Sequence, residues 1–189
     1  MAKIAREADV SEQNMRHFMS NSPWSGFEMI EQVQQTIRER PEMAGGVLIV
    51  DESADVKYGA SSAGASRQHN GRLGKVEQSQ VGVYLSYAKD EVWTLLDGEL
   101  FLPERWFSKS YAARRNKAEI PSERSAFQTK IELAWEMIER VQARGMPFVA
   151  VAFDSLYGRS YWLREQCDLA GIEYYADIHA NQVLYLEAV

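Results

Sequence analysis

The chain has 189 residues, a formal net charge of −6, 46% hydrophobic residues and 25% charged residues. These values are typical of one globular domain, or of one domain with an appendage, and they argue against disorder, collagen or coiled coil. No apolar run approaches the roughly 18 residues of a membrane span, and the polar start resembles no signal peptide. The single cysteine, Cys167, excludes a disulfide framework, so we expect a cytoplasmic protein with a buried, inert thiol.

The first forty residues are expected to form helices. Ser11 can cap a short helix, and apolar residues then repeat at helical spacing until Pro41 ends the pattern. These residues are Phe27, Ile30, Val33 and Ile37. A glycine pair follows as the expected hinge, so we predict a helical segment at residues 1–43 and a second domain at residues 44–189.

Beyond the hinge, the pattern changes to that of β-strands. Residues 47–50 form a continuous aliphatic run, which is typical of a central strand covered on both faces. A polar loop over residues 54–78 is expected next, and loops of this length are usually functional or mobile. Alternating apolar residues then predict an antiparallel hairpin of residues 81–85 and 92–101.

The last third of the chain alternates helices and strands. An apolar stripe from Phe127 to Val141 predicts a helix between Ser125 and Gly145, and residues 148–153 form a second apolar strand. A helix at residues 160–170 and a strand at residues 172–178 follow. This order predicts an α/β fold with a mixed sheet, and right-handed crossovers make the two apolar strands parallel.

Each of these two apolar strands ends in an aspartate, Asp51 or Asp154. If the strands are parallel neighbours, both carboxylates emerge at the same sheet edge, where open α/β sheets bind their ligands. Two adjacent carboxylates repel each other unless a cation lies between them, and Mg²⁺ or Mn²⁺ prefers such oxygen ligands. The pair therefore predicts a metal site for phosphodiester chemistry. The alternative is that each aspartate only caps the turn after its strand.

Two segments are more basic than the rest of the chain. Residues 54–78 carry four basic and two acidic residues, and residues 102–124 carry six basic and three acidic residues. Positive segments on an acidic body can hold a polyanion, because the local field steers it. The alternative is that they are solvated loops. Trp106, within the second segment, is interpreted either as a stacking platform for an unpaired base or as a packing residue.

Ordered motifs span nearly the whole chain. They are residues 50–53, Lys57, and residues 67–75, 80–83, 102–106, 129–134, 154–158 and 175–178. In this order they resemble the RNase H-like DDE transposases of bacterial insertion sequences, in the DDE superfamily endonuclease branch. The resemblance implies an RNase H-like mixed sheet with flanking helices, in which Asp51 and Asp154 are the first two catalytic aspartates and metal ligands.

Two departures from the family pattern bear on this site. Glu52 stands where relatives often have a second aspartate, which leaves open whether position 51 or 52 supplies the first ligand. The third carboxylate of the family, a glutamate on a later helix, has no counterpart, because Glu165 and Asp168 lie on the wrong element and Glu187 begins a further segment. We therefore expect a catalytic domain that is incomplete at its C-terminus, a fragment that is inactive alone.

The resemblance implies a DNA transposase, which cuts and joins strands at element ends by two-metal phosphoryl transfer with Mg²⁺ or Mn²⁺. Its partners would be element ends and target DNA, with no membrane, and a full-length form would be a homo-oligomer at the bacterial nucleoid. Basic residues would contact phosphates: Lys57, Arg67, Arg72, Lys75, Arg114 and Arg115. Two alternatives are an inactive remnant that binds DNA and a metal-dependent nuclease of similar fold.

Overall fold

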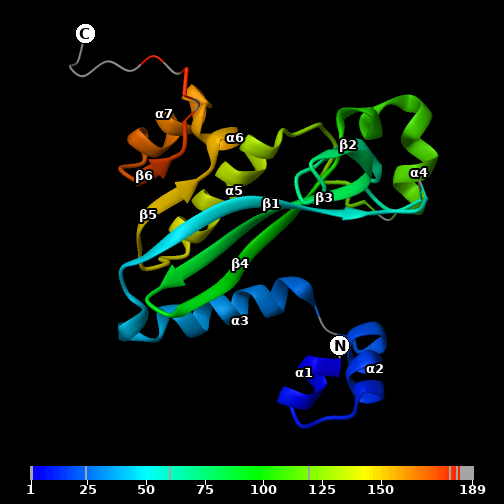
Figure 1. Cartoon of the computed structure of the whole chain (residues 1–189), viewed down its shortest axis with the longest axis horizontal. Helices are drawn as coiled ribbons and strands as arrows, with labels where there is room; N and C mark the ends of the chain where they lie inside the picture. Colours follow the sequence, from blue (N-terminus) through cyan, green and yellow to red (C-terminus); the bar gives the residue numbers. More distant parts are fainter. Residues whose placement is uncertain are drawn as a thin grey trace. The chain divides into compact units, whose positions relative to one another are not determined.

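The computed structural model describes residues 2–23, 25–59, 61–118, 120–178, 180–181 and 183 (Figure 1). The chain divides into two compact units, Met1–Gln35 and Thr36–Val189, and each is described by itself. The boundary that we predict between residues 43 and 44 stays a prediction. Among the described residues, no helix has the length and apolar character needed to cross a bilayer.

The first unit consists of helices, as the sequence predicts. They are α1 (Ala2–Glu7), α2 (Glu12–Asn21) and most of α3 (Gly26–Arg38). Ser11 caps α2, because its Oγ accepts a hydrogen bond from the Asn14 N–H at 3.1 Å. Helix α1 was not predicted as a separate helix. Its residues are strong helix formers, but they show no apolar periodicity that would indicate it.

Six described strands form one mixed sheet in the second unit. They are β1 (Gly46–Val56), β2 (Ser66–Asn70), β3 (Lys75–Lys89), β4 (Val92–Phe101), β5 (Phe148–Phe153) and β6 (Glu173–Ala176). The order is β2-β3-β1-β5-β6, and β4 also pairs with β3. The β1, β3 and β4 strands are antiparallel, whereas β1, β5 and β6 run parallel. The structure is thus α/β with a mixed sheet and flanking helices, and the predicted fold class is confirmed in these terms.

The loop predicted over residues 54–78 is wrong for about half of its length. Strand β1 continues to Val56, and β2 pairs with the first part of β3 from Ser66 opposite Ser79 to Asn70 opposite Lys75. This hairpin carries few apolar residues, so the alternation that reveals a half-buried strand is missing from its sequence. The next hairpin, β3 with β4, pairs as predicted.

Helices cover one face of the sheet. Helix α5 (Lys130–Ala143) contacts β3 and β4, and α7 (Tyr161–Leu169) contacts α5 and β6. Helix α5 begins later than predicted, because Thr129 and Glu132 form a capping box that fixes its first turn. Short helical turns connect the remaining elements: η1 (Pro41–Met43), η2 (Glu104–Phe107), η3 (Lys109–Tyr111), α4 (Ala112–Lys117) and α6 (Ser155–Gly158).

Two single residues follow their predicted structural roles. Trp106 is fully buried, and its indole N–H donates a hydrogen bond to the Ala65 carbonyl at 3.4 Å. It is therefore a packing residue, and the stacking interpretation is wrong. Cys167 is also fully buried, and burial raises the pKa of its thiol to about 11, which keeps it protonated and inert.

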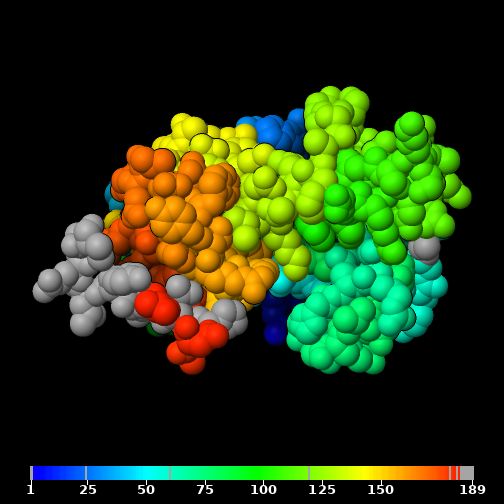
Figure 2. All heavy atoms as spheres, turned by 90° about the horizontal axis from the view of Figure 1, so that it is seen from above, coloured from blue at the N-terminus to red at the C-terminus, as the bar shows by residue number. Residues whose placement is uncertain are grey.

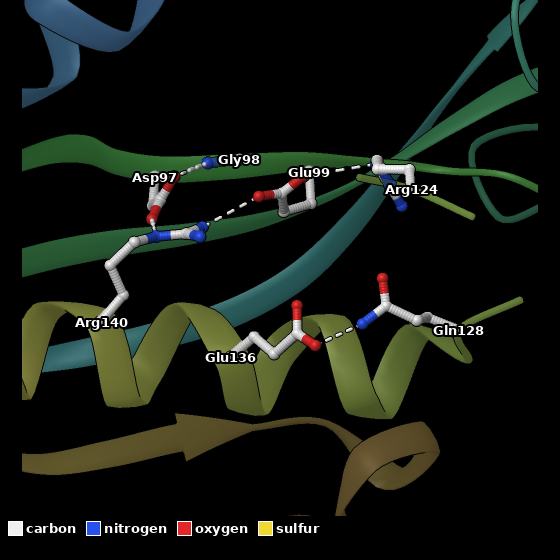
Figure 3. Close-up of polar contacts among 7 residues, drawn as sticks. All are labelled: Asp97, Gly98, Glu99, Arg124, Gln128, Glu136 and Arg140. Atoms are coloured by element: carbon white, nitrogen blue, oxygen red, sulfur yellow. Dashed lines mark hydrogen bonds and ion pairs between the residues drawn. The ribbon is translucent and has the colours of Figure 1, made fainter. Parts of the chain in front are cut away.

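A cluster of charged residues fixes β4 to α5 on this face (Figure 3). Asp97, of which 5% is exposed, accepts a hydrogen bond from the Arg140 Nε at 2.8 Å. Arg140 also pairs with Glu99 at 2.9 Å, and Arg124 reaches the other oxygen of Glu99 at 3.3 Å. Each carboxylate of this cluster thus has an arginine partner.

Candidate functional site

Asp51 and Asp154 each come directly after a residue of two neighbouring strands that are paired with each other. Strands β1 and β5 are parallel, and Val50 is paired with Phe153, the residues that directly precede the two aspartates. The prediction of parallel neighbouring strands is therefore confirmed. The expectation that both aspartates end their strands is wrong for Asp51, because β1 continues to Val56, and right for Asp154, which directly follows β5. Both aspartates line a cleft of about 620 Å³ and also a second hollow of about 560 Å³.

The Asp51 carboxylate lies in an unfavourable electrostatic environment. Burial is the main cause that raises its pKa, and the negative charges of Glu52 and Asp154 raise it further. Its Oδ1 accepts a hydrogen bond from the Glu52 N–H at 2.7 Å, whereas its Oδ2 has no hydrogen-bond donor among the described residues. A cation at this oxygen would relieve the repulsion.

Asp154 caps a helix, as the alternative interpretation predicts, and one of its carboxylate oxygens still has no donor among the described residues. Its Oδ1 accepts hydrogen bonds from the backbone N–H groups of Leu156 at 2.9 Å and Tyr157 at 3.4 Å, which begins α6. Its Oδ2 has no donor within the described part of the chain. Capping and ligand binding are therefore compatible, because they use different oxygens.

Glu52 follows Asp51 on β1 and lines the same cleft as the two aspartates. Its Oε1 accepts from the Lys130 Nζ at 2.8 Å, and its Oε2 accepts from the Tyr157 hydroxyl at 3.1 Å. Burial is the main cause that raises the pKa of Tyr157, with the neighbouring carboxylates adding to it, so the hydroxyl stays a donor. Both oxygens of Glu52 are thus engaged, which favours Asp51 over Glu52 as the ligand.

Basic side chains come to the same cleft from two separate elements. Arg72 and His69 come from the β2–β3 hairpin, and Arg159 follows α6 directly. Figure 2 shows the hairpin in teal and the region around α6 in orange, facing each other across a hollow. His69 and Arg159 were not among the predicted site residues. The available signal for Arg159 was its position directly after the motif at residues 154–158.

The other predicted DNA-binding residues do not line this cleft. Lys57 forms an ion pair with Asp55 and Lys75 with Glu77, each at 2.8 Å, while Arg67 is exposed on β2. Two arginines lie on α4 over aromatic rings, Arg114 at 4.8 Å from the centre of Tyr111 and Arg115 at 5.7 Å from that of Phe107. The predicted set is therefore distributed over the surface, and one member, Arg72, lines the same cleft as the two aspartates.

Three described carboxylates line this cleft, those of Asp51, Glu52 and Asp154, and no group of three or more histidine, cysteine, aspartate or glutamate side chains among the described residues could hold a metal ion. Asp177 lines the second hollow together with Asp51 and Asp154. Glu165 and Asp168 lie on α7, as predicted, and Glu187 lies outside the described residues.

Comparisons with known proteins show which proteins this chain is similar to. A curated relative, "Probable transposase for insertion sequence element IS701" from Microchaete diplosiphon, is 29% identical over 154 residues, which are 79% of this chain and 36% of the relative. The chain thus spans about a third of that relative's length.

A solved structure, "Mos1 transposase paired-end complex with left transposon end", is 15% identical and covers 95% of this chain and 54% of its own chain with a TM-score of 0.32. The family described as DDE superfamily endonuclease matches residues 1–189, and enzymes of the DDE type generally use divalent metal ions. Because this match covers the whole chain, the protein belongs to the DDE superfamily endonuclease family.

Proposed function

We propose that this chain carries the first two catalytic carboxylates, Asp51 and Asp154, of a DNA transposase that cuts and joins strands at insertion-sequence ends. The observation that supports it is their position on neighbouring parallel strands, at a cleft that also holds Arg72 and Arg159. Acidic groups for a cation and basic groups for an anion thus meet in one hollow. This combination suits a phosphodiester, because its negative charge is attracted both to a metal ion held by the aspartates and to the arginines.

The donor set fits a hard divalent cation. Asp51 and Asp154 each present one carboxylate oxygen that no described donor occupies, and oxygen ligands of this kind suit Mg²⁺ or Mn²⁺. When bound, such a metal would activate the attacking oxygen and stabilise the leaving one. Two aspartates hold such ions less rigidly than three carboxylates would, so we propose that a third carboxylate completes the site in the active enzyme.

The basic residues have a separate role in this proposal. Arg72 and Arg159 bind the phosphates beside the cut site, and His69 donates a hydrogen bond to the same backbone. Such contacts position DNA without reading its sequence. Arg67, Arg114 and Arg115 hold more distant phosphates, whereas Lys57 and Lys75 contribute less, because each already has an acidic partner. The full-length form would act on element ends and target DNA at the bacterial nucleoid, as a homo-oligomer.

A metal-binding experiment tests the acidic half of the proposal. We expect Mn²⁺, followed by electron paramagnetic resonance, to bind the chain, and either Asp51→Asn or Asp154→Asn to weaken binding by at least about 10-fold, since loss of outer-shell partners alone often costs that much. Asparagine still caps helices, so Asp154→Asn keeps α6. Asp90→Asn, at the β3–β4 turn, is the matched control and should bind as the wild type does. Equal binding by all four proteins would contradict the metal site.

A reaction with a supercoiled donor plasmid tests the need for a third carboxylate. We expect residues 1–189 to give no detectable strand transfer with Mg²⁺ or Mn²⁺, because misplacement by about 1 Å can cost on the order of 100-fold in rate. Joined products that disappear in Asp154→Asn would show that the third ligand lies within this chain. Asp177, which lines the second hollow, and Glu187 would be the first residues to test. Metal-independent DNA binding without any cleavage would favour an inactive remnant.

A further inference from the structure

Glu52 connects the strands that carry the two aspartates. It follows Asp51 on β1, and its carboxylate accepts hydrogen bonds from Lys130, at the start of α5, and from Tyr157, on α6. The side chains of Glu52 and Lys130 are 25% and 22% exposed, and Tyr157 is fully buried. A contact of this kind, largely shielded from water, is held more firmly than a surface pair.

The same residues also hold both aspartates through their backbone. The Glu52 N–H donates to Asp51, and the Tyr157 N–H donates to Asp154. The hydroxyl of Tyr157 then closes the connection to the Glu52 carboxylate at 3.1 Å. An unbroken series of hydrogen bonds and covalent bonds thus runs from one aspartate to the other.

Lys130 makes this connection electrostatically tolerable. A third negative charge beside Asp51 and Asp154 would increase the repulsion between carboxylates, and the Lys130 ammonium, 2.8 Å from Glu52, offsets it. The packing of α6 adds rigidity, because a Cβ at Gly158 would lie 2.2 Å from the Asp177 carbonyl oxygen. Helix α6 is therefore seated directly against the chain that follows β6.

We propose that Glu52, Lys130 and Tyr157 form a positioning triad that sets the separation of the Asp51 and Asp154 carboxylates without touching the metal or DNA. The inference rests on the proposed function, in which these aspartates are the ligands. It assigns to Glu52 a role distinct from metal binding. Outer partners of this kind orient ligands, and their loss typically lowers metal affinity.

The test uses Tyr157→Phe, which removes one hydroxyl and keeps the ring that fills the core. We expect amide hydrogen exchange, measured by nuclear magnetic resonance without metal, to become about 10-fold faster at the N–H groups of Glu52 and Tyr157, since a hydrogen bond to a charged group is lost. Mn²⁺ affinity should fall about 10-fold. Tyr161→Phe, at an exposed position of α7, is the matched control and should change neither quantity.

The outcomes separate this inference from the proposed function. Unchanged amide exchange in Tyr157→Phe overturns the triad, and so does faster exchange with unchanged Mn²⁺ affinity. If the wild-type chain shows no Mn²⁺ binding that depends on Asp51, the proposed function fails. In that case the rate of amide hydrogen exchange at Glu52 alone decides whether the triad holds the aspartates. The double variant Tyr157→Phe with Glu52→Ala should bind Mn²⁺ no worse than Glu52→Ala alone, because that change already removes the acceptor of the Tyr157 hydroxyl.

Discussion

Two groups of acidic residues in the second unit have opposite surroundings. On the helix-covered face, Asp97 and Glu99 share the guanidinium of Arg140, and Arg124 adds a second cation (Figure 3). At the open sheet edge, Asp51 and Asp154 form no ion pair with any described residue. Both groups bring carboxylates close together, but one neutralises them within the chain and the other does not.

This difference separates a structural role from a functional one. Burial works to lower the pKa of Arg140, but its hydrogen bonds and attraction to Asp97 and Glu99 outweigh burial and raise it, which shows a cation held in place by its partners. The pKa of Asp51 is raised instead, chiefly by burial and also by like charges. A carboxylate in that state is available to an external cation, whereas a paired one is not.

Removal of the arginine should break the paired cluster. Arg140→Met leaves Asp97 buried without its cation, so we expect the free energy of unfolding to fall by about 3 kcal/mol. Urea unfolding followed by circular dichroism measures it. Lys75→Met removes a partner from an exposed pair with Glu77 and should cost less than about 1 kcal/mol. Equal losses in the two variants would contradict a structural role specific to the buried cluster.

Lys130 combines features of the two groups, because it neutralises Glu52, which is next to Asp51, a carboxylate without an ion-pair partner among the described residues. Lys130→Met should lower Mn²⁺ affinity by about 10-fold, since Glu52 loses the partner that fixes it. Lys130→Arg keeps the charge and should retain most of the affinity. Titration of Mn²⁺ into both variants distinguishes a positioning role from a general loss of packing, which the longer arginine would not restore.

The cleft arginines should matter for DNA more than the paired lysines. Arg72→Ala and Arg159→Ala should each weaken DNA binding several-fold at all sequences and reduce the slope of log affinity against log salt by about 1. Lys57→Ala should have a smaller effect, because Asp55 already pairs with this lysine. Fluorescence polarisation over a range of salt concentrations measures both quantities. A uniform effect of all three variants would show that the cleft is not the main contact.

The smallest expected effect is a pH dependence of stability. The raised pKa of Asp51 means that the folded chain holds its proton more tightly than the unfolded chain does. The free energy of unfolding should therefore lose a contribution as the pH rises from below the ordinary value of 3.8 through the raised pKa. Asp51→Asn should remove this decrease, and Mn²⁺ should reverse it in the wild type. An identical pH profile for the wild type and Asp51→Asn would contradict the raised pKa.

Several elements could be predicted from the sequence because their signals are local. Apolar runs of strand length identify β1 and β5, and the residues after them are the two aspartates of the cleft. The hydroxyl of Ser11 caps α2 from three residues away. The parallel pairing of β1 with β5 also follows, because crossover connections in a sheet have one preferred hand. Patterns within a short window, together with this rule, therefore determined the fold class and the positions of Asp51 and Asp154.

The tertiary structure alone decided how these aspartates are surrounded. Hairpin β2–β3 has too few apolar residues to reveal its strands, and its pairing is what carries Arg72 into the cleft. Glu52 meets Lys130 from 78 residues away and Tyr157 from 105 residues away. Contacts at such separations depend on register and helix packing, and no local periodicity encodes them. The sequence by itself therefore determined which two aspartates come together at the cleft, and the fold determined which carboxylates keep an oxygen without a donor among the described residues.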